Sequence, residues 1–133
     1  METIFTKIIK GEIPCYKIAE DEQFFAFLDI NPLTKGHTLV VPKKHTSYIF
    51  DMGDKELGEM MVFAKKVAAA IQKNVECLRI GVAVIGLEVP HTHIHMVPMK
   101  EENDLNFRKE RPKVSPEEMK NIAEKIAQSY QNM

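Results

Sequence analysis

The sequence lacks the features that mark several large classes of protein. It has no tryptophan, two isolated cysteines (Cys15 and Cys77), and a formal net charge of −1 over 133 residues. Without CxxC pairs, a disulfide framework or a thiolate zinc site is not expected, and the cysteines fit a reducing cytoplasm. The small net charge argues against nucleic acid or an anionic membrane as a partner. No run approaches the roughly 18–20 apolar residues of a membrane span, and the N-terminus has no signal-peptide pattern.

What is present is typical of a globular domain. Hydrophobic residues make up 44% of the chain and charged residues 28%, a balance that supports a buried core. The length is that of one domain of ordinary size, and no repeat or low-complexity tract divides it. We therefore expect residues 1–133 to form a single domain.

The first half of the chain contains short apolar runs separated by turn residues. Residues 4–10 are apolar on one side and stop at Gly11, which predicts one or two helical turns. "CYKIAED" and "FFAFLDI" flank an acidic cluster and read as a β-hairpin, and "HTLVVP" reads as a buried strand. Residues 51–74 change to a helical period with Asp51 as a plausible N-cap. The predicted core stripe is Leu57, Met60, Met61, Ala64, Ala68, Ile71 and Val75.

The second half adds two strands and a terminal helix. "RIGVAVIG" predicts a strand, and a histidine-rich run bounded by prolines follows it. Residues 100–113 are charge-dense and unpatterned, so we expect an exposed, mobile loop. Ser115, Pro116 and Glu118 fit a capping box that opens a helix over residues 115–131. Because strands cluster before and after one long helix, the order predicts an α+β fold with a mainly antiparallel five-stranded sheet.

The histidine-rich run is the feature that suggests chemistry. "VPHTHIHMVP" places His91, His93 and His95 at alternate positions, and alternation on a strand puts them on one face. Thr92, Ile94 and Met96 then share the opposite, core-facing side. Same-face neighbours lie roughly 6.5–7 Å apart, which suits three rings around one small ligand.

Three interpretations of this run are open from the residues alone. Surface histidines on an exposed sheet face are the simplest, although strict alternation beside an apolar face weakens it. Metal binding is the second, since imidazole is a common metal ligand. Phosphoryl or nucleotidyl chemistry is the third, because neutral imidazole is a usable nucleophile near neutral pH.

The run also resembles a known signature. "HTHIHMV" is similar to the His-φ-His-φ-His-φ-φ motif of the histidine triad (HIT) family, in which φ is apolar; Thr92 departs from it. "IFTKIIKGEIPCYKIAEDEQFFAFLDINPLTKGHTLVVPKKH" resembles the N-terminal half of Hint-type members. The two blocks occur in the expected order and together cover nearly all of residues 3–98. The resemblance implies the HIT fold.

The resemblance also implies an activity and a set of residues. HIT proteins displace a leaving group from the α-phosphate of purine nucleoside monophosphate derivatives through a nucleotidyl-histidine, without a cofactor. The nucleophile would be His93, with His91, His95 and His37 around it. Asp29 matches the residue that holds the ribose hydroxyls. The apolar slot for the purine corresponds to Ile4, Phe5, Ile8, Phe27 and Ile30. For Phe5 and Ile8, plain core packing explains the residue equally well.

Two departures from the Hint pattern bear on these expectations. The connection "AVIGLEVPHTH" is short, and Leu87 and Glu88 stand where a polar pair would contact phosphate. Glu88 would repel a phosphate if it pointed inward, or it would orient a histidine. Some relatives carry a zinc site that begins with a cysteine near the N-terminus. Thr6 stands there in this chain, so no structural zinc is expected.

The resemblance finally implies an oligomeric state. Hint-type proteins are commonly two-fold dimers whose long helices and sheets pair. The apolar stripe of the predicted long helix is wide enough to serve both a core and a partner, with Met60, Met61 and Ala68 as candidates. The expected partners are therefore a purine nucleotide and a second copy of the chain.

Overall fold

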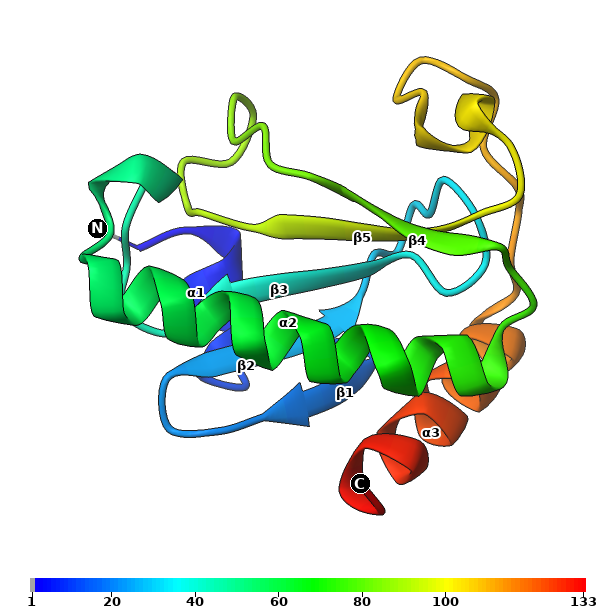
Figure 1. The fold of residues 1–133 in the computed structure, drawn as a ribbon, viewed down its shortest axis with the longest axis horizontal. Helices are drawn as coiled ribbons and strands as arrows, with labels where there is room; N and C mark the ends of the chain where they lie inside the picture. The colour runs from blue at the N-terminus through cyan, green and yellow to red at the C-terminus, as the bar shows by residue number, and fades with distance from the viewer. Residues whose placement is uncertain (1) are drawn as a thin grey trace.

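A five-stranded sheet organises the computed structural model, which describes residues 2–133 (Figure 1). Each pair of neighbouring strands is antiparallel, and the order across the sheet is β1-β2-β3-β5-β4. The strands are β1 (Lys17–Glu20), β2 (Phe24–Leu28), β3 (Thr38–Pro42), β4 (Arg79–Ala83) and β5 (Ile94–Met99). The α+β architecture with an antiparallel five-stranded sheet, predicted from the sequence, is confirmed.

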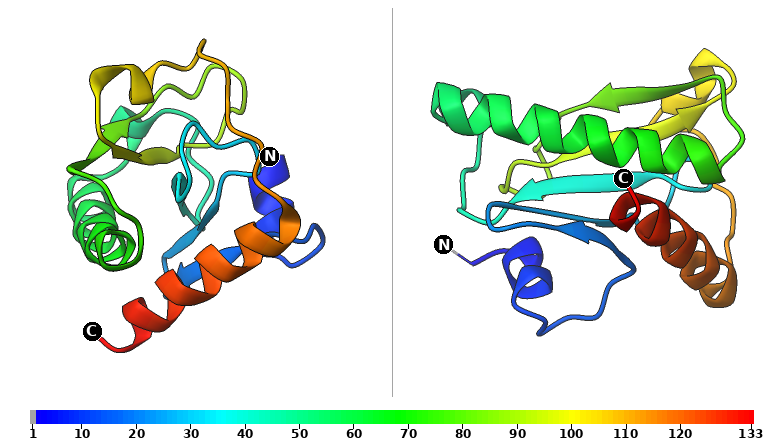
Figure 2. Two further views of the ribbon diagram at one scale, coloured as in Figure 1. Left: turned by 90° about the vertical axis from the view of Figure 1, so that its right-hand side faces the viewer. Right: turned by 60° about the horizontal axis from the view of Figure 1, so that its bottom comes forward.

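Helices cover both faces of the sheet. The long helix α2 (Asp54–Asn74) and the C-terminal helix α3 (Pro116–Gln131) lie side by side on one face, and the short helix α1 (Ile4–Ile9) packs on the other (Figure 2). Two 3₁₀ turns, η1 (Ile49–Asp51) and η2 (Glu102–Leu105), complete the described elements. Between residues 2 and 133, no helix is long and apolar enough to cross a membrane.

Strand alternation divides the core in two. Along β2, Phe24, Ala26 and Leu28 point toward α2 and α3, while Phe25 and Phe27 pack beneath α1. The strand is therefore buried on both sides, which explains why it reads as a continuous apolar run. In β5, Ile94 and Met96 point into the larger core, as the alternation predicts. His95 therefore lies on the α1 face.

The start and the buried stripe of α2 differ from the prediction. Asp51 belongs to η1, and Gly53 is the N-cap of α2, so Asp51 does not cap this helix. Met61 is 45% exposed, whereas Phe63 and Val67 are buried. The core stripe thus runs through Met60, Phe63, Ala64, Val67, Ala70 and Ile71. These positions recur at i, i+3 and i+4 on one face, so the apolar Met61 falls outside the buried arc.

The predicted C-terminal helix is present. The side chain of Ser115 accepts a hydrogen bond from the Glu118 backbone N–H at 3.1 Å, and Pro116 occupies the first turn. Met119, Ala123 and Ile126 are buried against the larger core. Local capping chemistry and helical period, both readable from sequence, set this element.

Two segments near the histidines differ from their predictions. The ladder of β5 begins only at Ile94, because the Thr92 backbone N–H donates to the Thr46 carbonyl and the segment 91–93 follows the loop after β3. Residues 100–113, predicted to be an exposed loop, are mostly exposed. They also include η2, and Phe107 and Arg111 are half-buried. The mobility of this segment stays a prediction.

Candidate active site

The candidate active site lies on the α1 face, where strands β2 and β3 meet β5. Asp29 follows β2, His37 precedes β3, and His95 pairs with Leu39 inside the sheet. The Asp29 backbone N–H donates to the His37 carbonyl at 2.9 Å, which continues the β2–β3 ladder by one pair. Residues distant in sequence are thus fixed on neighbouring backbones.

The structure brings the predicted histidines together. The ring centroids of His93 and His95 are 4.9 Å apart, and those of His37 and His95 are 5.2 Å apart. The rings are tilted and lie closer than the roughly 6.5–7 Å spacing of an ideal strand face. His37 and His91 are fully buried, while His93 and His95 keep 7% and 8% of their surface exposed. The simplest sequence interpretation, histidines on an exposed face, is wrong.

The hydrogen bond of His93 fixes which ring nitrogen is free to react. Nδ1 of His93 lies 2.7 Å from the carbonyl oxygen of His91, and a carbonyl can only accept. Nδ1 therefore carries the proton, and in the neutral ring Nε2 keeps its lone pair. Phe5 packs edge-on against the ring at 4.9 Å, which helps hold its orientation.

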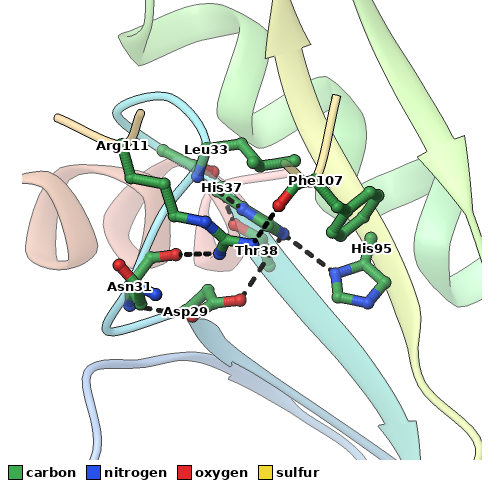
Figure 3. A network of polar contacts seen from close by, with 9 residues as sticks. Asp29, Asn31, Leu33, His37, Thr38, His95, Phe107 and Arg111 are labelled. Atoms are coloured by element: carbon green, nitrogen blue, oxygen red, sulfur yellow. Dashed lines mark hydrogen bonds and ion pairs between the residues drawn. The ribbon is translucent and has the colours of Figure 1, made fainter. Parts of the chain in front are cut away.

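His37 and His95 form a directed chain of hydrogen bonds (Figure 3). The Leu33 backbone N–H donates to Nδ1 of His37 at 3.0 Å, so neutral His37 carries its proton on Nε2. That Nε2–H donates to Nδ1 of His95, also at 3.0 Å. His95 in turn carries its proton on Nε2 and is left as a donor.

Burial keeps both rings of this chain neutral. Desolvation, reinforced by the neighbouring His95, lowers the pKa of His37 to about 3. Desolvation, followed by the effect of His93, lowers the pKa of His95 to about 4. The charge of Arg111 acts in the same direction on both. At neutral pH the pair is therefore a chain of two uncharged rings joined by a hydrogen bond.

His91 has both ring nitrogens engaged. Nε2 donates to the Pro42 carbonyl at 2.9 Å, and Nδ1 lies 3.0 Å from the hydroxyl of Thr3. Burial lowers the pKa of His91, and its bond to the Pro42 carbonyl partly offsets this effect. With no free nitrogen, His91 is suited to support the site, since its own carbonyl orients His93.

Asp29 completes the polar cluster. One carboxylate oxygen accepts from the Asn31 backbone N–H at 2.8 Å, and the other lies 3.7 Å from Nε2 of His37. Burial raises the pKa of the Asp29 carboxyl, while the Asn31 hydrogen bond and the nearby Arg111 charge lower it. The carboxylate retains acceptor capacity that hydroxyl groups of a ligand can use.

The predicted nucleoside residues divide into two groups. Phe5, Ile8 and Phe27 are buried in the smaller core beside the histidines. Ile4 is 49% exposed and Ile30, directly after Asp29, is 78% exposed, so neither belongs to that core. Glu88 is exposed on the connection between β4 and β5.

Sequence reasoning missed three residues that contact the histidines, and also Arg111, whose charge lowers the pKa of His37 and His95. His45 donates to the Pro90 carbonyl at 2.7 Å and packs against the His91 ring at 5.1 Å. Phe107 packs edge-on against His95 at 4.8 Å. The Thr3 hydroxyl bonds His91, and Arg111 donates to the Asn31 carbonyl, two residues after Asp29. One signal was available: Phe107 is the only aromatic residue in its charge-dense segment.

One cluster in residues 2–133 has metal-ligand geometry. Asp29, His37 and His95 each place a donor atom within 4.8 Å of the others. The hydrogen bonds oppose such a role, because Nε2 of His37 carries the proton it donates to His95, and its Nδ1 accepts from Leu33. An ion would require His37 to lose that proton or turn its ring. The residues therefore do not fit a resident metal in this arrangement.

Comparison with known proteins agrees with the geometry. The HIT domain family model matches residues 10–102. The chain belongs to the HIT family. It is 39% identical over 129 residues to the adenosine 5'-monophosphoramidase of Schizosaccharomyces pombe, covering 96% of this chain and 97% of that protein. It is 35% identical over 132 residues to Protein hit of Bacillus subtilis, covering 93% of this chain and 91% of that one.

Solved structures of HIT proteins share the fold. A zinc-bound histidine triad protein from Mycobacterium smegmatis superposes with a TM-score of 0.81 at 28% identity, covering 99% of this chain and 95% of that one. A HIT protein from Bacillus anthracis gives 0.72 at 37% identity, covering 95% of each chain. The predicted family and the HIT fold are confirmed.

Proposed function

We propose that this HIT protein is an enzyme that cleaves the α-phosphate bond of purine nucleoside monophosphate derivatives, phosphoramidates first among them. The observation that carries the proposal is the free Nε2 lone pair of His93 beside the Nε2–H donor of His95. The 39% identity to an adenosine 5'-monophosphoramidase supports the substrate class.

In the first step Nε2 of His93 attacks the α-phosphorus. The P–N bond breaks, its electron pair leaves with the nitrogen, and the nitrogen takes up a proton from solvent and departs as ammonia or an amine. The Nε2–H of His95 donates to a phosphoryl oxygen, where charge develops in the transition state. Nδ1–H of His93 keeps its bond to the His91 carbonyl, which stabilises the positive charge that the ring gains.

In the second step water attacks the same phosphorus. The bond between phosphorus and Nε2 of His93 breaks, the ring regains its lone pair, and a nucleoside monophosphate leaves. The proton that water loses balances the proton that the amine gained. Imidazole suits this route because it is both a fair nucleophile and a fair leaving group.

Asp29 is the proposed anchor for the ribose. Its carboxylate lies between the Asn31 backbone and the His37–His95 pair, and two adjacent hydroxyls suit its remaining acceptor sites. The proposed base-binding residues are Ile4, Phe5, Ile8, Phe27 and Ile30. Of these, the exposed Ile4 and Ile30 are free to contact a ligand without disturbing the core.

A single-turnover experiment tests this function. The protein is mixed in excess with adenosine 5'-monophosphoramidate carrying labelled phosphate and quenched rapidly. We expect a labelled nucleotidyl-protein adduct that is absent in His93→Ala. It should be present in His45→Ala, because the His45 ring is not the proposed nucleophile. Steady-state turnover of His93→Ala should fall by at least about 10³-fold. Hydrolysis by His93→Ala at the wild-type rate would refute the assignment of His93 as the nucleophile.

Two other classes of protein are the alternatives to an enzyme of this kind, and each has a direct test. A nucleotide-binding module that has lost turnover through its altered connection would bind adenosine monophosphate in calorimetry and yield no adduct. A histidine-ligated metalloprotein would retain a stoichiometric ion after purification without an affinity tag. The hydrogen bonds of His37 and His93 argue against the second.

We also propose that two copies associate through the β4 edge. Strand β4 pairs only with β5 among the described strands, and an unpaired edge favours pairing with another chain. Val82 and Val84 along this edge are 51% and 37% exposed. Met60 has 0% exposure within its own chain, so it cannot serve a partner as the sequence suggested. Met61 and the half-buried Ala68 remain candidates.

A further inference from the structure

Residues 106–111, here called the strap, lie over the His37–His95 pair although the sequence marks them as a surface loop. The strap follows η2, and its residues Phe107 and Arg111 lie beside His95 and Asn31 respectively (Figure 3). Its turn is held by the Lys109 backbone N–H, which donates to the Asn106 carbonyl at 3.1 Å, and by the Arg108 backbone N–H, which donates to the Asn106 side chain at 2.9 Å. The strap is thus an ordered segment with bonds of its own.

Phe107 is the strap residue that contacts the histidines. Its ring centroid lies 4.8 Å from that of His95 at an interplanar angle of 76°, and 6.5 Å from that of His37 at 79°. These are edge-to-face contacts of the kind that aromatic rings favour. His95 is therefore packed against His37, His93 and Phe107.

Arg111 fastens the strap to the body of the protein. Its guanidinium donates to the Asn31 carbonyl at 2.6 Å and to the Phe107 carbonyl at 3.2 Å. The same group lies over the Phe107 ring at 5.9 Å. One side chain thus joins the backbone that carries Phe107 to the loop directly after Asp29.

We propose that Phe107 is a positioning residue for His95, and that Arg111 acts with it by tethering the strap to Asn31. This inference rests on the proposed nucleotidyl transfer, in which His95 must point its Nε2–H at the phosphoryl group. Phe107 limits rotation of the His95 ring and keeps water from its face. Misplacement of such a donor by about 1 Å can cost as much as ~10²-fold in rate.

The contribution of Phe107 can be measured through the pKa of His95, which is set by burial and by the charged and titratable groups around the ring. They are Asp29 after β2, His37 before β3, His93 before β5, and Arg111 on the strap. Phe107 adds no charge, so its removal chiefly lets in water. Since desolvation is the main reason that the pKa of His95 is depressed to about 4, hydration should move this pKa upward toward the ordinary value of about 6.5.

The test compares Phe107→Ala and Arg111→Gln with Phe107→Leu and a control, Phe50→Ala. Phe107→Leu keeps an apolar cover, and Phe50 is an aromatic residue of η1 that is 72% exposed and packs against Tyr48. For Phe107→Ala we expect kcat to fall about 10-fold with KM within about 3-fold. The kcat of Arg111→Gln should also fall, but by a smaller factor. Phe107→Leu and Phe50→Ala should stay within about 3-fold of the parent protein.

An NMR titration of the imidazole nitrogens, without substrate, gives the second readout. In Phe107→Ala the His95 titration should move upward, and in Phe50→Ala it should not. Because this measurement needs no turnover, it reports on the strap even if His93 forms no adduct and the proposed function fails. If Phe107→Ala does not fold, Arg111→Lys carries the same test, because it keeps the positive charge that itself lowers the pKa of His95 but loses the paired guanidinium bonds to Asn31 and Phe107. A lower melting temperature with unchanged kcat and unchanged His95 titration would reduce the strap to a structural cover and overturn the proposal.

Discussion

Nδ1 of His93 lies 2.7 Å from the carbonyl oxygen of His91, two residues earlier in the chain. This bond assigns the proton of His93 to one nitrogen and leaves the other with its lone pair. The His91 ring is itself fixed by Pro42 and Thr3. The three triad histidines therefore have different hydrogen-bonding states.

Substitutions at His37 should separate its two hydrogen bonds. Asn can place an acceptor near Nδ1 for the Leu33 N–H, while Gln can place a donor near Nε2 for His95. We expect His37→Asn to keep most of the stability but lose about 10-fold in kcat. We expect His37→Gln to keep more activity but lose about 1–3 kcal/mol of unfolding free energy, since the buried Leu33 N–H is left unpaired. Turnover and urea denaturation measure the two effects, and equal behaviour of the two variants would contradict the assignment.

Stability should fall on acidification through the buried histidine pair. The pKa of His37 is lowered to about 3 and that of His95 to about 4, whereas the unfolded rings titrate near about 6.5. Below pH 6.5 the unfolded chain binds more protons than the fold does. The free energy of unfolding should therefore drop by a few kcal/mol as the pH falls toward 4. Urea denaturation at several pH values measures this, and a His37→Asn/His95→Asn double variant should show a flatter profile over the same interval.

Thr3 should matter to both stability and turnover. Its hydroxyl caps α1 through the Thr6 backbone N–H and also bonds Nδ1 of His91. We expect Thr3→Ala to destabilise the protein by about 1 kcal/mol and to reduce kcat severalfold, because His91 then holds the carbonyl partner of His93 less firmly. Thr3→Ser keeps the hydroxyl and is the matched control. A Thr3→Ser variant as impaired as Thr3→Ala would show that the methyl group, and not the hydroxyl, is the important feature.

Glu88 should weakly repel the phosphate group of a substrate, and added salt should screen this repulsion. Its side chain is exposed, so its repulsion of a phosphate acts through solvent and is screened within about 8–10 Å at physiological ionic strength. We expect Glu88→Ser to raise kcat/KM about 2- to 5-fold at low salt and to have little effect at high salt. Turnover measured across a salt series checks this prediction. A loss of activity in Glu88→Ser would instead indicate that the carboxylate accepts a proton or orients a histidine.

A charge on the β4 edge should separate the proposed dimer. Val82→Lys places an ammonium group where a second copy would pair, and sedimentation should then show a monomer. Val62→Lys is the control. Val62 is 70% exposed on α2 and lines a hollow with Asp21 and Tyr130, and Asp21 follows β1 at the opposite edge of the sheet from β4. A parent protein that sediments as a monomer at all concentrations would refute the dimer.

The amino-acid sequence determined most of the secondary structure and the chemical character of the site. Strand alternation, the Ser115 cap and the helical period are local properties, so they predicted the sheet, α3 and the face that carries His95. The helical period did not fix the rotation of α2 about its own axis, because apolar residues such as Met61 also lie beside the buried stripe. The resemblance to the HIT family identified His93, His95, His37 and Asp29 as candidates.

Only the tertiary structure decided what each of these groups can do. For His91 and His95, whether a ring nitrogen donates or accepts depends on a partner far away in sequence: Pro42 for His91 and His37 for His95. No local pattern encodes such a pairing, because it arises from the register between strands. The same holds for Phe107 and Arg111, whose polar surroundings predicted an exposed loop. They reach the site because the chain beyond β5 turns back across the sheet and buries an aromatic ring against His95.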